Sequence, residues 1–430
     1  MLVGSSVRRV AILGGLRTPF ARAYGAYAGL GNQDLLTETL RALVQRYRLT
    51  GERLGDVIAG AVIKHSRDYN LVRECVLSSG LDPATPGLDV QRACGTSLEA
   101  AILLGNRIAL GQVDCGIAGG SDSISDPPVV YPRGYQQLLL RSYMARSVVD
   151  RVRPFLGLRP RHFKPVLPGV VEPRTGLSMG QSMELTAQQW QISRAEQDEL
   201  AWHSHANAAA AWQEGFYDDL VTPCHGLARD NNVRADSSVE KLARLKPAFD
   251  FTGKGTLTAG NSTPLTDGAS AVLLASEEWA RQHDLPVLAW LSYGKVRAVD
   301  FASGKEGLLM APAHAVPAML RDAGLALADF DYYEIHEAFA AQALATLKAW
   351  ESDDYCRNVL GLPGALGVID RTKLNVKGGS VALGHPFAAT GTRILGSLAK
   401  LLHHDNNARR GLVSICTAGG MGVTAIVEKA

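Results

Sequence analysis

The sequence has few cysteines, no long apolar run and almost no excess charge, and each of these absences excludes a class of protein. Its six cysteines in 430 residues are scattered without a CxxC pair, which argues against a disulfide framework and a structural zinc site. No window approaches the roughly 18 apolar residues of a transmembrane helix, and the first residues lack an apolar block of secretory type. A net charge of +2 does not indicate nucleic acid as the main partner. We therefore expect a cytoplasmic protein with reduced thiols.

What the sequence does contain is an alternation of short β-rich runs with amphipathic runs. This alternation predicts a mostly parallel sheet covered by helices, in a chain too long for one simple core. This alternation stops near residue 127, where prolines, aromatics and arginines are frequent, and it resumes near the run TLTAGNSTPL at residues 256–265. We therefore predict an N-terminal half made of 1–126 and 256–284, an inserted loop domain at 127–255 and a C-terminal half at 285–430. Within the insert, we expect a long helical stretch over 181–216.

The two predicted halves repeat one another. Residues 89–120 and 375–420 both read as a strand, a glycine-bearing turn, a helix and a strand that closes on Ala-Gly-Gly. Such a repeat indicates a duplicated α/β unit. If the two units pack about a pseudo-twofold axis, their equivalent helix N-termini can face one another. Cys94 begins one of these helices and His385 begins the other.

Residue type alone leaves the roles of these two side chains open. Buried cysteines commonly only pack, and an isolated histidine is often structural. A helix N-terminus stabilises a thiolate, however, and a nearby imidazole can take the thiol proton. Cys416, which ends a strand before the glycine-rich run TAGGMG, adds a second thiol. Two cysteines and a histidine in one site suit a reaction in which one thiol carries an acyl group and the other moves a proton.

Six motifs in this chain resemble those of thiolases, the acyl-CoA C-acetyltransferases, in the same order and along nearly the whole chain. They are RACGTSLEA, MG…ISRAEQDELAWHSHANAAAAW, TAGNSTPLTDGASAV, IHEAFAAQALA, NVKGGSVALGHPFAATG and CTAGGMG. The resemblance implies the α/β class and the duplicated, five-layered αβαβα thiolase fold with an inserted loop domain. It also implies the fatty-acid β-oxidation reaction in which 3-ketoacyl-CoA and CoA give acetyl-CoA and a shortened acyl-CoA through an acyl-cysteine. It implies no metal and no permanently bound cofactor, since coenzyme A serves as substrate.

The same resemblance implies a role for each site residue. Cys94 would accept the acyl group, and His385 would activate Cys94 and help to bind the thioester oxygen. Cys416 would exchange a proton with the acetyl α-carbon. The backbone amides of Cys94 and Ala418 would form an oxyanion hole, with Ala418 where many relatives carry glycine. The residues expected to contact substrate are Met179, Asn261, Thr263, Phe339 and Gly384.

One motif departs from the commoner pattern. Many thiolases carry Asn-Glu-Ala-Phe where this chain has HEAF, residues 336–339, and their asparagine holds a catalytic water near the thioester oxygen. The resemblance implies that His336 takes this role, as in thiolases of the trifunctional-enzyme type, which degrade longer 3-ketoacyl-CoAs. The alternative is that His336 only caps the following helix.

The arginine-rich insert agrees with that subgroup, in which the loop domain covers coenzyme A and can touch a partner subunit or a membrane surface. The expected ligands are 3-ketoacyl-CoA and CoA, and the expected assembly is a homodimer or a dimer of dimers. A hydratase/dehydrogenase subunit is a candidate partner, and residues 127–170 are a candidate for peripheral membrane contact. A hairpin that merely faces water is the alternative for this segment.

Two alternative functions stay open at this point. The same site could run a Claisen condensation, as a biosynthetic acetoacetyl-CoA thiolase or a related ketoacyl synthase. The protein could also be a non-catalytic acyl-CoA-binding subunit, although the presence of Cys94, His385 and Cys416 argues against that.

Overall fold

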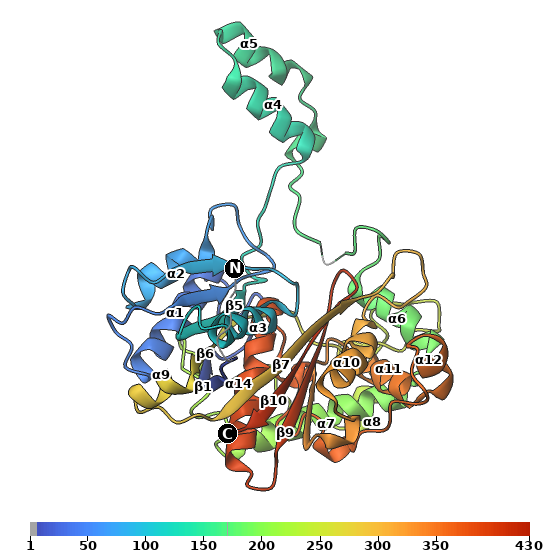
Figure 1. The fold of residues 1–430 in the computed structure, drawn as a ribbon. Helices are drawn as coiled ribbons and strands as arrows, with labels where there is room; N and C mark the ends of the chain where they lie inside the picture. Colours follow the sequence, from blue (N-terminus) through green and yellow to red (C-terminus); the bar gives the residue numbers. More distant parts are fainter. Residues whose placement is uncertain (1–6, 170) are drawn as a thin grey trace.

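In the computed structural model, which describes residues 7–169 and 171–430, ten strands form one sheet (Figure 1). The order along the sheet is β4-β3-β5-β6-β1-β7-β10-β9-β8, and the short β2 pairs with β6. The strands are β1 (Val10–Arg17), β2 (Ala21–Arg22), β3 (Asp56–Ala59), β4 (Gly87–Asp89), β5 (Cys115–Asp122), β6 (Thr266–Ser276), β7 (Ala289–Ala298), β8 (Tyr332–Ile335), β9 (Arg410–Thr417) and β10 (Met421–Lys429).

The sheet consists of two half-sheets with the same internal pattern. In the first half, β3 and β5 are parallel, and β5–β6 and β6–β1 are antiparallel. In the second half, β8 and β9 are parallel, and β9–β10 and β10–β7 are antiparallel. Among the described strands, the two half-sheets pair with each other through β1 and β7, at two residue pairs. This repetition is the duplicated α/β unit that the sequence predicted.

The helices lie in three layers around the two half-sheets. Helix α3 contacts strands of both halves, and so does α14, so these two helices form the central layer. Helix α1 packs on the first half-sheet and α10 on the second, each on the outer side. The helices are α1 (Asn32–Arg46), α2 (Leu71–Ser79), α3 (Thr96–Ala109), α4 (Arg133–Met144), α5 (Val148–Val152), α6 (Met179–Gln189), α7 (Arg194–Gln213), α8 (Val239–Ala243), α9 (Glu277–Gln282), α10 (Ala311–Ala323), α11 (Ala340–Glu351), α12 (Asp353–Asn358), α13 (Ser380–Leu383) and α14 (Thr390–His404).

Burial of the helices follows their layers. Helix α14 is buried on every side from Thr390 to Leu402, because both of its faces meet protein. Helix α1 buries only one face, as expected for an outer helix with water on the other side. The central layer therefore brings the start of α14 and the start of α3 together inside the molecule, where the Thr392 amide donates to Ser97 Oγ at 2.9 Å.

The segment between the halves has two parts with different surroundings. Helices α4 and α5 project from the body as a hairpin (Figure 1), and neither has a buried residue. Helices α6 and α7 instead pack against α11, and α7 also packs against α13. The division of the chain into domains at 126, 255 and 284 stays a prediction.

The structure differs from the sequence expectation in four places. The sheet was predicted to be mostly parallel, but among the described strands only the pairs β3–β4, β3–β5 and β8–β9 are parallel. Strands β9 and β10, for example, are joined by a tight turn, and such a turn connects antiparallel neighbours. The helix expected over 181–216 is two helices, α6 and α7, because Gln191 takes a left-handed conformation (φ 50°) and Ser193 caps a new helix. The strand expected near Leu374 is a single parallel bridge to Tyr333. His385 does not begin its helix: it lies in the loop between α13 and α14.

Candidate functional site

The turn that carries Cys94 is held by its own hydrogen bonds. Thr96 Oγ1 accepts from the Arg92 amide at 2.9 Å and donates to the Ala93 carbonyl at 2.7 Å. Ala93 has a left-handed backbone (φ 43°), a conformation that costs a non-glycine residue about 1 kcal/mol or more. At Gly95 a side chain would collide with Val423 of β10 at 2.6 Å, so glycine allows this turn to approach the second half.

The loop that carries His385 is held against the first half of the chain. Gly384 has φ 102°, and a side chain there would lie 2.8 Å from Thr266. The His385 amide donates to Thr266 Oγ1 at 2.7 Å. Asp122, at the end of β5, accepts from the Ala388 amide at 2.7 Å. The first half-sheet thus positions the loop that carries His385 in the second half.

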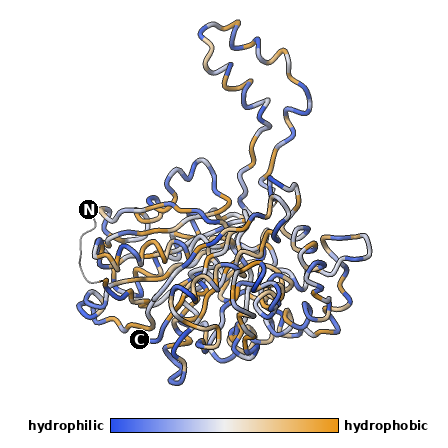
Figure 2. The backbone as a smooth tube through the Cα atoms, turned by 45° about the vertical axis from the view of Figure 1, so that its right-hand side comes forward, coloured by the Kyte–Doolittle hydropathy of each residue, from blue (hydrophilic) through white to orange (hydrophobic). Residues whose placement is uncertain are grey.

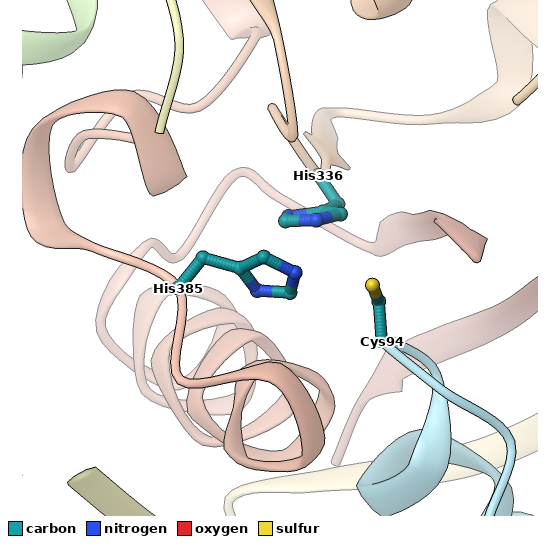
Figure 3. Close-up of side chains that lie close together, drawn as sticks. All are labelled: Cys94, His336 and His385. Carbon is teal, nitrogen blue, oxygen red and sulfur yellow. The ribbon is translucent and has the colours of Figure 1, made fainter. Parts of the chain in front are cut away.

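Three side chains from different segments converge in this region (Figure 3). The sulfur of Cys94 and ring nitrogens of His336 and His385 all lie within 4.8 Å of one another. The two imidazole rings are 4.1 Å apart between centroids, and both are almost fully buried. Cys94 precedes α3 and His385 precedes α14, and the structure brings these two side chains together as the repeat predicted. His336 follows β8 and lies outside the repeated segments.

The two backbone amides expected in an oxyanion hole both lie near the Cys94 sulfur. The N–H groups of Ala418 and of Cys94 itself each lower the pKa of this thiol, against the larger effect of its burial. Ala418 lies in the tight connection between β9 and β10, directly after the strand that carries Cys416. An oxygen of a substrate attached to this sulfur would therefore lie close to two N–H donors.

The hydrogen bonds of His385 make it a proton acceptor toward Cys94. Its Nδ1 lies 2.5 Å from Thr390 Oγ1, and the Thr390 hydroxyl donates to the Pro386 carbonyl. With that hydroxyl proton committed, Nδ1 of His385 carries the ring proton and donates it. Nε2 is left with a free lone pair, and it has no hydrogen-bond partner among the described residues.

The hydrogen bonds of His336 give this ring the opposite tautomer. Its Nδ1 lies 2.8 Å from Ser380 Oγ, which accepts from the buried Arg393 guanidinium at 2.7 Å. Ser380 therefore has its own proton to donate to Nδ1 of His336. The ring proton then sits on Nε2, which faces the site as a hydrogen-bond donor. One imidazole can take a proton and the other can stabilise a developing negative charge.

The electrostatics keep all four reactive groups neutral before substrate binds. Burial lowers the pKa of His385 to about 3, with the positive charge of Arg393 adding to the effect. Burial, then the neighbouring His385 and Arg393, lower the pKa of His336 well below its usual range. Burial raises the pKa of the Cys94 thiol to about 12 and that of Cys416 well above its usual range. The resting site is a thiol beside a neutral imidazole.

Comparison with known proteins agrees with this geometry. The model of the thiolase N-terminal domain matches residues 10–278, and that of the thiolase C-terminal domain matches residues 291–429. The chain belongs to the thiolase family. The family resemblance, the fold class and the acyltransferase class of enzyme predicted from the motifs are thereby confirmed.

Several relatives of known name or structure resemble this thiolase over nearly its full length. The 3-ketoacyl-CoA thiolase of Pectobacterium atrosepticum is 42% identical, over 98% of this chain and 96% of its own. That of Yersinia pestis is 41% identical, over 98% and 97%. The acetyl-CoA acetyltransferase of Bacillus anthracis superposes with a TM-score of 0.83 at 29% identity, covering 99% and 100% of the two chains. A thiolase from Ascaris suum in complex with coenzyme A gives 0.80 at 27%, covering 98% and 100%.

The residues expected to contact substrate in this thiolase fall into two groups. Four of them lie near the HEAF loop or next to His385, and the fifth, Asn261, is bound by other residues of the chain. Thr263 donates through its hydroxyl to the Ser380 carbonyl at 3.1 Å and through its amide to Ala338, so it borders the HEAF loop. Phe339 packs edge-on against Phe249, and Met179 belongs to the same hydrophobic cluster. Gly384 adjoins His385.

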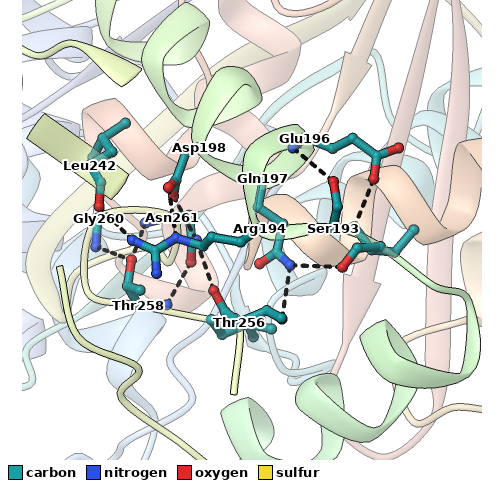
Figure 4. A network of polar contacts seen from close by, with 12 residues as sticks. Ser193, Arg194, Glu196, Gln197, Asp198, Leu242, Thr256, Thr258, Gly260 and Asn261 are labelled. Carbon is teal, nitrogen blue, oxygen red and sulfur yellow. Dashed lines mark hydrogen bonds and ion pairs between the residues drawn. The ribbon is translucent and has the colours of Figure 1, made fainter. Parts of the chain in front are cut away.

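Asn261 stands apart from the rest because its amide is occupied within the chain (Figure 4). Its Nδ2 donates to Asp198 at 2.9 Å, and its Oδ1 accepts from the Thr258 amide at 2.7 Å. Asp198 in turn binds Arg194 of the same helix, α7. The residue thus fastens the loop before β6 to α7. A direct contact between Asn261 and substrate stays a prediction.

Sequence reasoning missed the residues that orient the two histidines. Thr390 and Ser380 both lie inside the motif NVKGGSVALGHPFAATG, and Arg393 follows it by two residues. The signal was present in the motif, but no spacing rule shows which hydroxyl meets which ring nitrogen. Asp122 was missed as well, although it ends the strand that closes on Ala-Gly-Gly.

The tautomer of His336 can be tested through Ser380. Replacing Ser380 with alanine removes the donor to Nδ1, so the ring loses its preference for carrying the proton on Nε2. A buried hydrogen bond of this kind contributes about 1–2 kcal/mol, so we expect kcat to fall about tenfold with a smaller change in KM. Ser79→Ala on α2, where the hydroxyl also makes two hydrogen bonds, serves as the matched control. A Ser380→Ala enzyme with the kcat of the Ser79→Ala control would refute the assignment.

Proposed function

We propose that this chain catalyses the thiolytic cleavage of 3-ketoacyl-CoA by CoA, giving acetyl-CoA and a shortened acyl-CoA, in fatty-acid β-oxidation. One observation carries the proposal: the Cys94 thiol lies between a base, His385, and two backbone donors, with a second imidazole beside it. The names of the bacterial relatives support the degradative reaction over a biosynthetic condensation. The coenzyme A in the Ascaris suum structure supports coenzyme A as a substrate.

In the first stage, Cys94 would attack the 3-keto carbon. Nε2 of His385 takes the thiol proton as the carbon–sulfur bond forms, and the amides of Cys94 and Ala418 stabilise the oxyanion. The bond between C2 and C3 then breaks, and its electron pair moves onto C2 as an enolate of acetyl-CoA. The protonated His385 and Nε2–H of His336 stabilise the thioester oxygen of this enolate. Cys416, a neutral thiol, gives its proton to C2.

In the second stage, the acyl group would pass from Cys94 to a new CoA. The Cys416 thiolate accepts the proton of the CoA thiol, and the CoA sulfur attacks the acyl-Cys94 carbonyl in the same oxyanion hole. Cys94 leaves as a thiolate and recovers its proton from His385. Every group returns to its starting protonation state. The cycle needs no redox change and no resident metal or cofactor.

The reaction can be tested with purified protein, CoA and a series of 3-ketoacyl-CoAs of increasing chain length. We expect acetyl-CoA and the acyl-CoA two carbons shorter in equal amounts. The chain length with the highest kcat/KM defines the substrate class. Formation of 3-ketoacyl-CoA from acyl-CoA and acetyl-CoA as the only detectable reaction would instead favour the biosynthetic alternative.

We further propose that the chain forms a homodimer, or a dimer of such dimers, in the cytoplasm. Strand β4 ends the sheet, one of its edges has no partner strand among the described residues, and such an edge can pair with a second copy. The six cysteines are all free, which suits a reducing compartment. Light scattering of the purified protein measures the assembly, and a monomeric mass would refute it.

The projecting hairpin is proposed to contact an anionic membrane surface. No helix in the described part of the chain is both long and apolar enough to cross a bilayer. Hydrophobic and hydrophilic residues alternate along the hairpin (Figure 2), and its apolar side chains have no core to cover them. The large exposed ones include Leu140, Tyr143, Met144, Val148 and Val149. Arginines beside them suit lipid phosphates.

Vesicle binding tests this contact. We expect the protein to sediment with vesicles that contain phosphatidylserine and to be released by high salt. Changing Arg141, Arg146 and Arg151 to glutamine should weaken binding about 100-fold, since each basic residue near such a surface contributes about 1 kcal/mol. The matched control changes three exposed arginines of the body, Arg281, Arg321 and Arg357 on α9, α10 and α12, to glutamine. Equal binding of both variants would argue against the hairpin and favour a protein partner for it.

A further inference from the structure

The three side chains at the centre of the site carry a second property that catalysis does not require. Cys94, His336 and His385 each offer one donor atom, and the three atoms lie within 4.8 Å of one another. Both Nε2 atoms are buried without a hydrogen-bond partner among the described residues. His336 and His385 are only 1% and 2% exposed, so these nitrogens can meet only what enters the site. Figure 3 shows both rings and the sulfur around one small space.

We propose that Cys94, His336 and His385 form a binding site for Zn²⁺, and that the bound metal blocks the catalytic thiol. A thiolate and two imidazoles are ligands that zinc prefers, whereas Mg²⁺ and Ca²⁺ prefer oxygen. Zinc binds sulfur at about 2.3 Å and histidine nitrogen at about 2.0–2.1 Å, so the donors need only a small inward movement. Three protein ligands leave the fourth tetrahedral position open to water.

The groups behind the ligands suit metal binding. Metal-bound histidines usually hold their second ring nitrogen in a hydrogen bond, and Thr390 and Ser380 provide that bond here. His385 already has its lone pair on Nε2. His336 must move its ring proton from Nε2 to Nδ1, after which Ser380 Oγ accepts from both Arg393 and the ring. The entering Zn²⁺ replaces the thiol proton of Cys94, and one proton is released to solvent.

One consequence follows from the identity of the ligands. The third ligand comes from the histidine of the HEAF motif, so asparagine at position 336 should leave an incomplete site. Metal binding rests on the geometry of the donors alone, whereas inhibition of thiolysis also rests on the proposed function.

Cobalt titration of the purified full chain tests the site without an activity assay. Co²⁺ takes the place of Zn²⁺ and gives intense visible bands in tetrahedral sites, with a thiolate-to-metal charge-transfer band when cysteine is a ligand. We expect one Co²⁺ per chain with both features, and displacement by Zn²⁺. Cys94→Ala should remove the charge-transfer band, and His336→Asn should weaken Co²⁺ binding at least about tenfold. Cys115→Ala and His203→Asn, at a buried cysteine in β5 and an exposed histidine in α7, should bind as wild type does.

Circular dichroism of each variant establishes that it is folded. An unchanged cobalt spectrum in folded Cys94→Ala, or the absence of a charge-transfer band in wild type, would overturn the metal site. Zn²⁺ inhibition of thiolysis that EDTA reverses and acyl-CoA opposes would support both the metal site and the function. A cobalt site in a protein without thiolase activity would support the metal site and refute the function. Thiolysis without cobalt binding or zinc inhibition would support the function and refute the metal site.

Discussion

Replacing Cys94 with alanine is expected to lower thiolysis by about 10⁴-fold or more, because no other group in the site can carry the acyl chain. The thiol lies within reach of His385 and beside two backbone donors, and Cys416 is committed to proton transfer at carbon. Steady-state release of acetyl-CoA from 3-ketoacyl-CoA measures the effect. The alanine removes only the sulfur, so the turn held by Thr96 should keep its fold.

Cys115→Ala provides the matched control for this experiment. Cys115 is also a free cysteine, but it is buried in β5 away from the convergent histidines. The control variant should retain thiolysis close to that of wild type. Thiolysis in Cys94→Ala at the level of Cys115→Ala would mean that the acyl group is carried elsewhere, and the proposed mechanism would fail.

Replacing Cys416 with alanine should separate the two stages of the reaction. Cys416 is the second-last residue of β9, and burial and the neighbouring Cys94 raise its pKa well above the usual range, so it is a thiol with a proton to donate. Loss of a general acid–base group costs about 10²–10⁴-fold, and we expect carbon–carbon cleavage to fall by about 10³-fold. Acyl transfer between CoA and Cys94 should fall less, because the CoA thiol can exchange its proton with water when Cys416 is absent, whereas the carbon C2 needs a positioned proton donor.

Two assays on the same variant distinguish these stages. Thiolysis of 3-ketoacyl-CoA reports carbon–carbon cleavage, and exchange of labelled CoA into a simple acyl-CoA reports acyl transfer alone. The predicted result is a ratio of exchange to thiolysis that rises at least about tenfold over wild type. An equal loss of both activities would show that Cys416 serves the nucleophile and has no separate role at the α-carbon.

The internal repeat explains why the pairing of Cys94 with the His385 loop could be predicted. A repeated strand–turn–helix unit places its two turns at equivalent positions, and the central layer of α3 and α14 brings them face to face. The repeat could not show that His385 precedes its helix, where a short turn at residues 387–389 separates it from α14. That detail depends on Gly384 and Thr266, which lie far apart in the sequence.

The tautomers of the two histidines could also not be predicted from the sequence. Each tautomer depends on where the neighbouring hydroxyl donates its proton. The Thr390 hydroxyl donates to the Pro386 carbonyl, whereas the Ser380 hydroxyl donates to the ring of His336. Such commitments are set by tertiary contacts that have no periodicity. The break between α6 and α7 was missed because a left-handed Gln191 has no strong signal in its residue type.

The most direct test of the central claim, that Cys94 carries the acyl group, is peptide mass spectrometry of the wild-type protein. The protein is mixed with a 3-ketoacyl-CoA in the absence of free CoA, quenched in acid and digested. The account predicts an acyl adduct on the peptide that contains Cys94, with the mass of the chain shortened by two carbons, and its loss when CoA is added before the quench. An adduct on another residue, or none on Cys94 while acetyl-CoA is released, would contradict it.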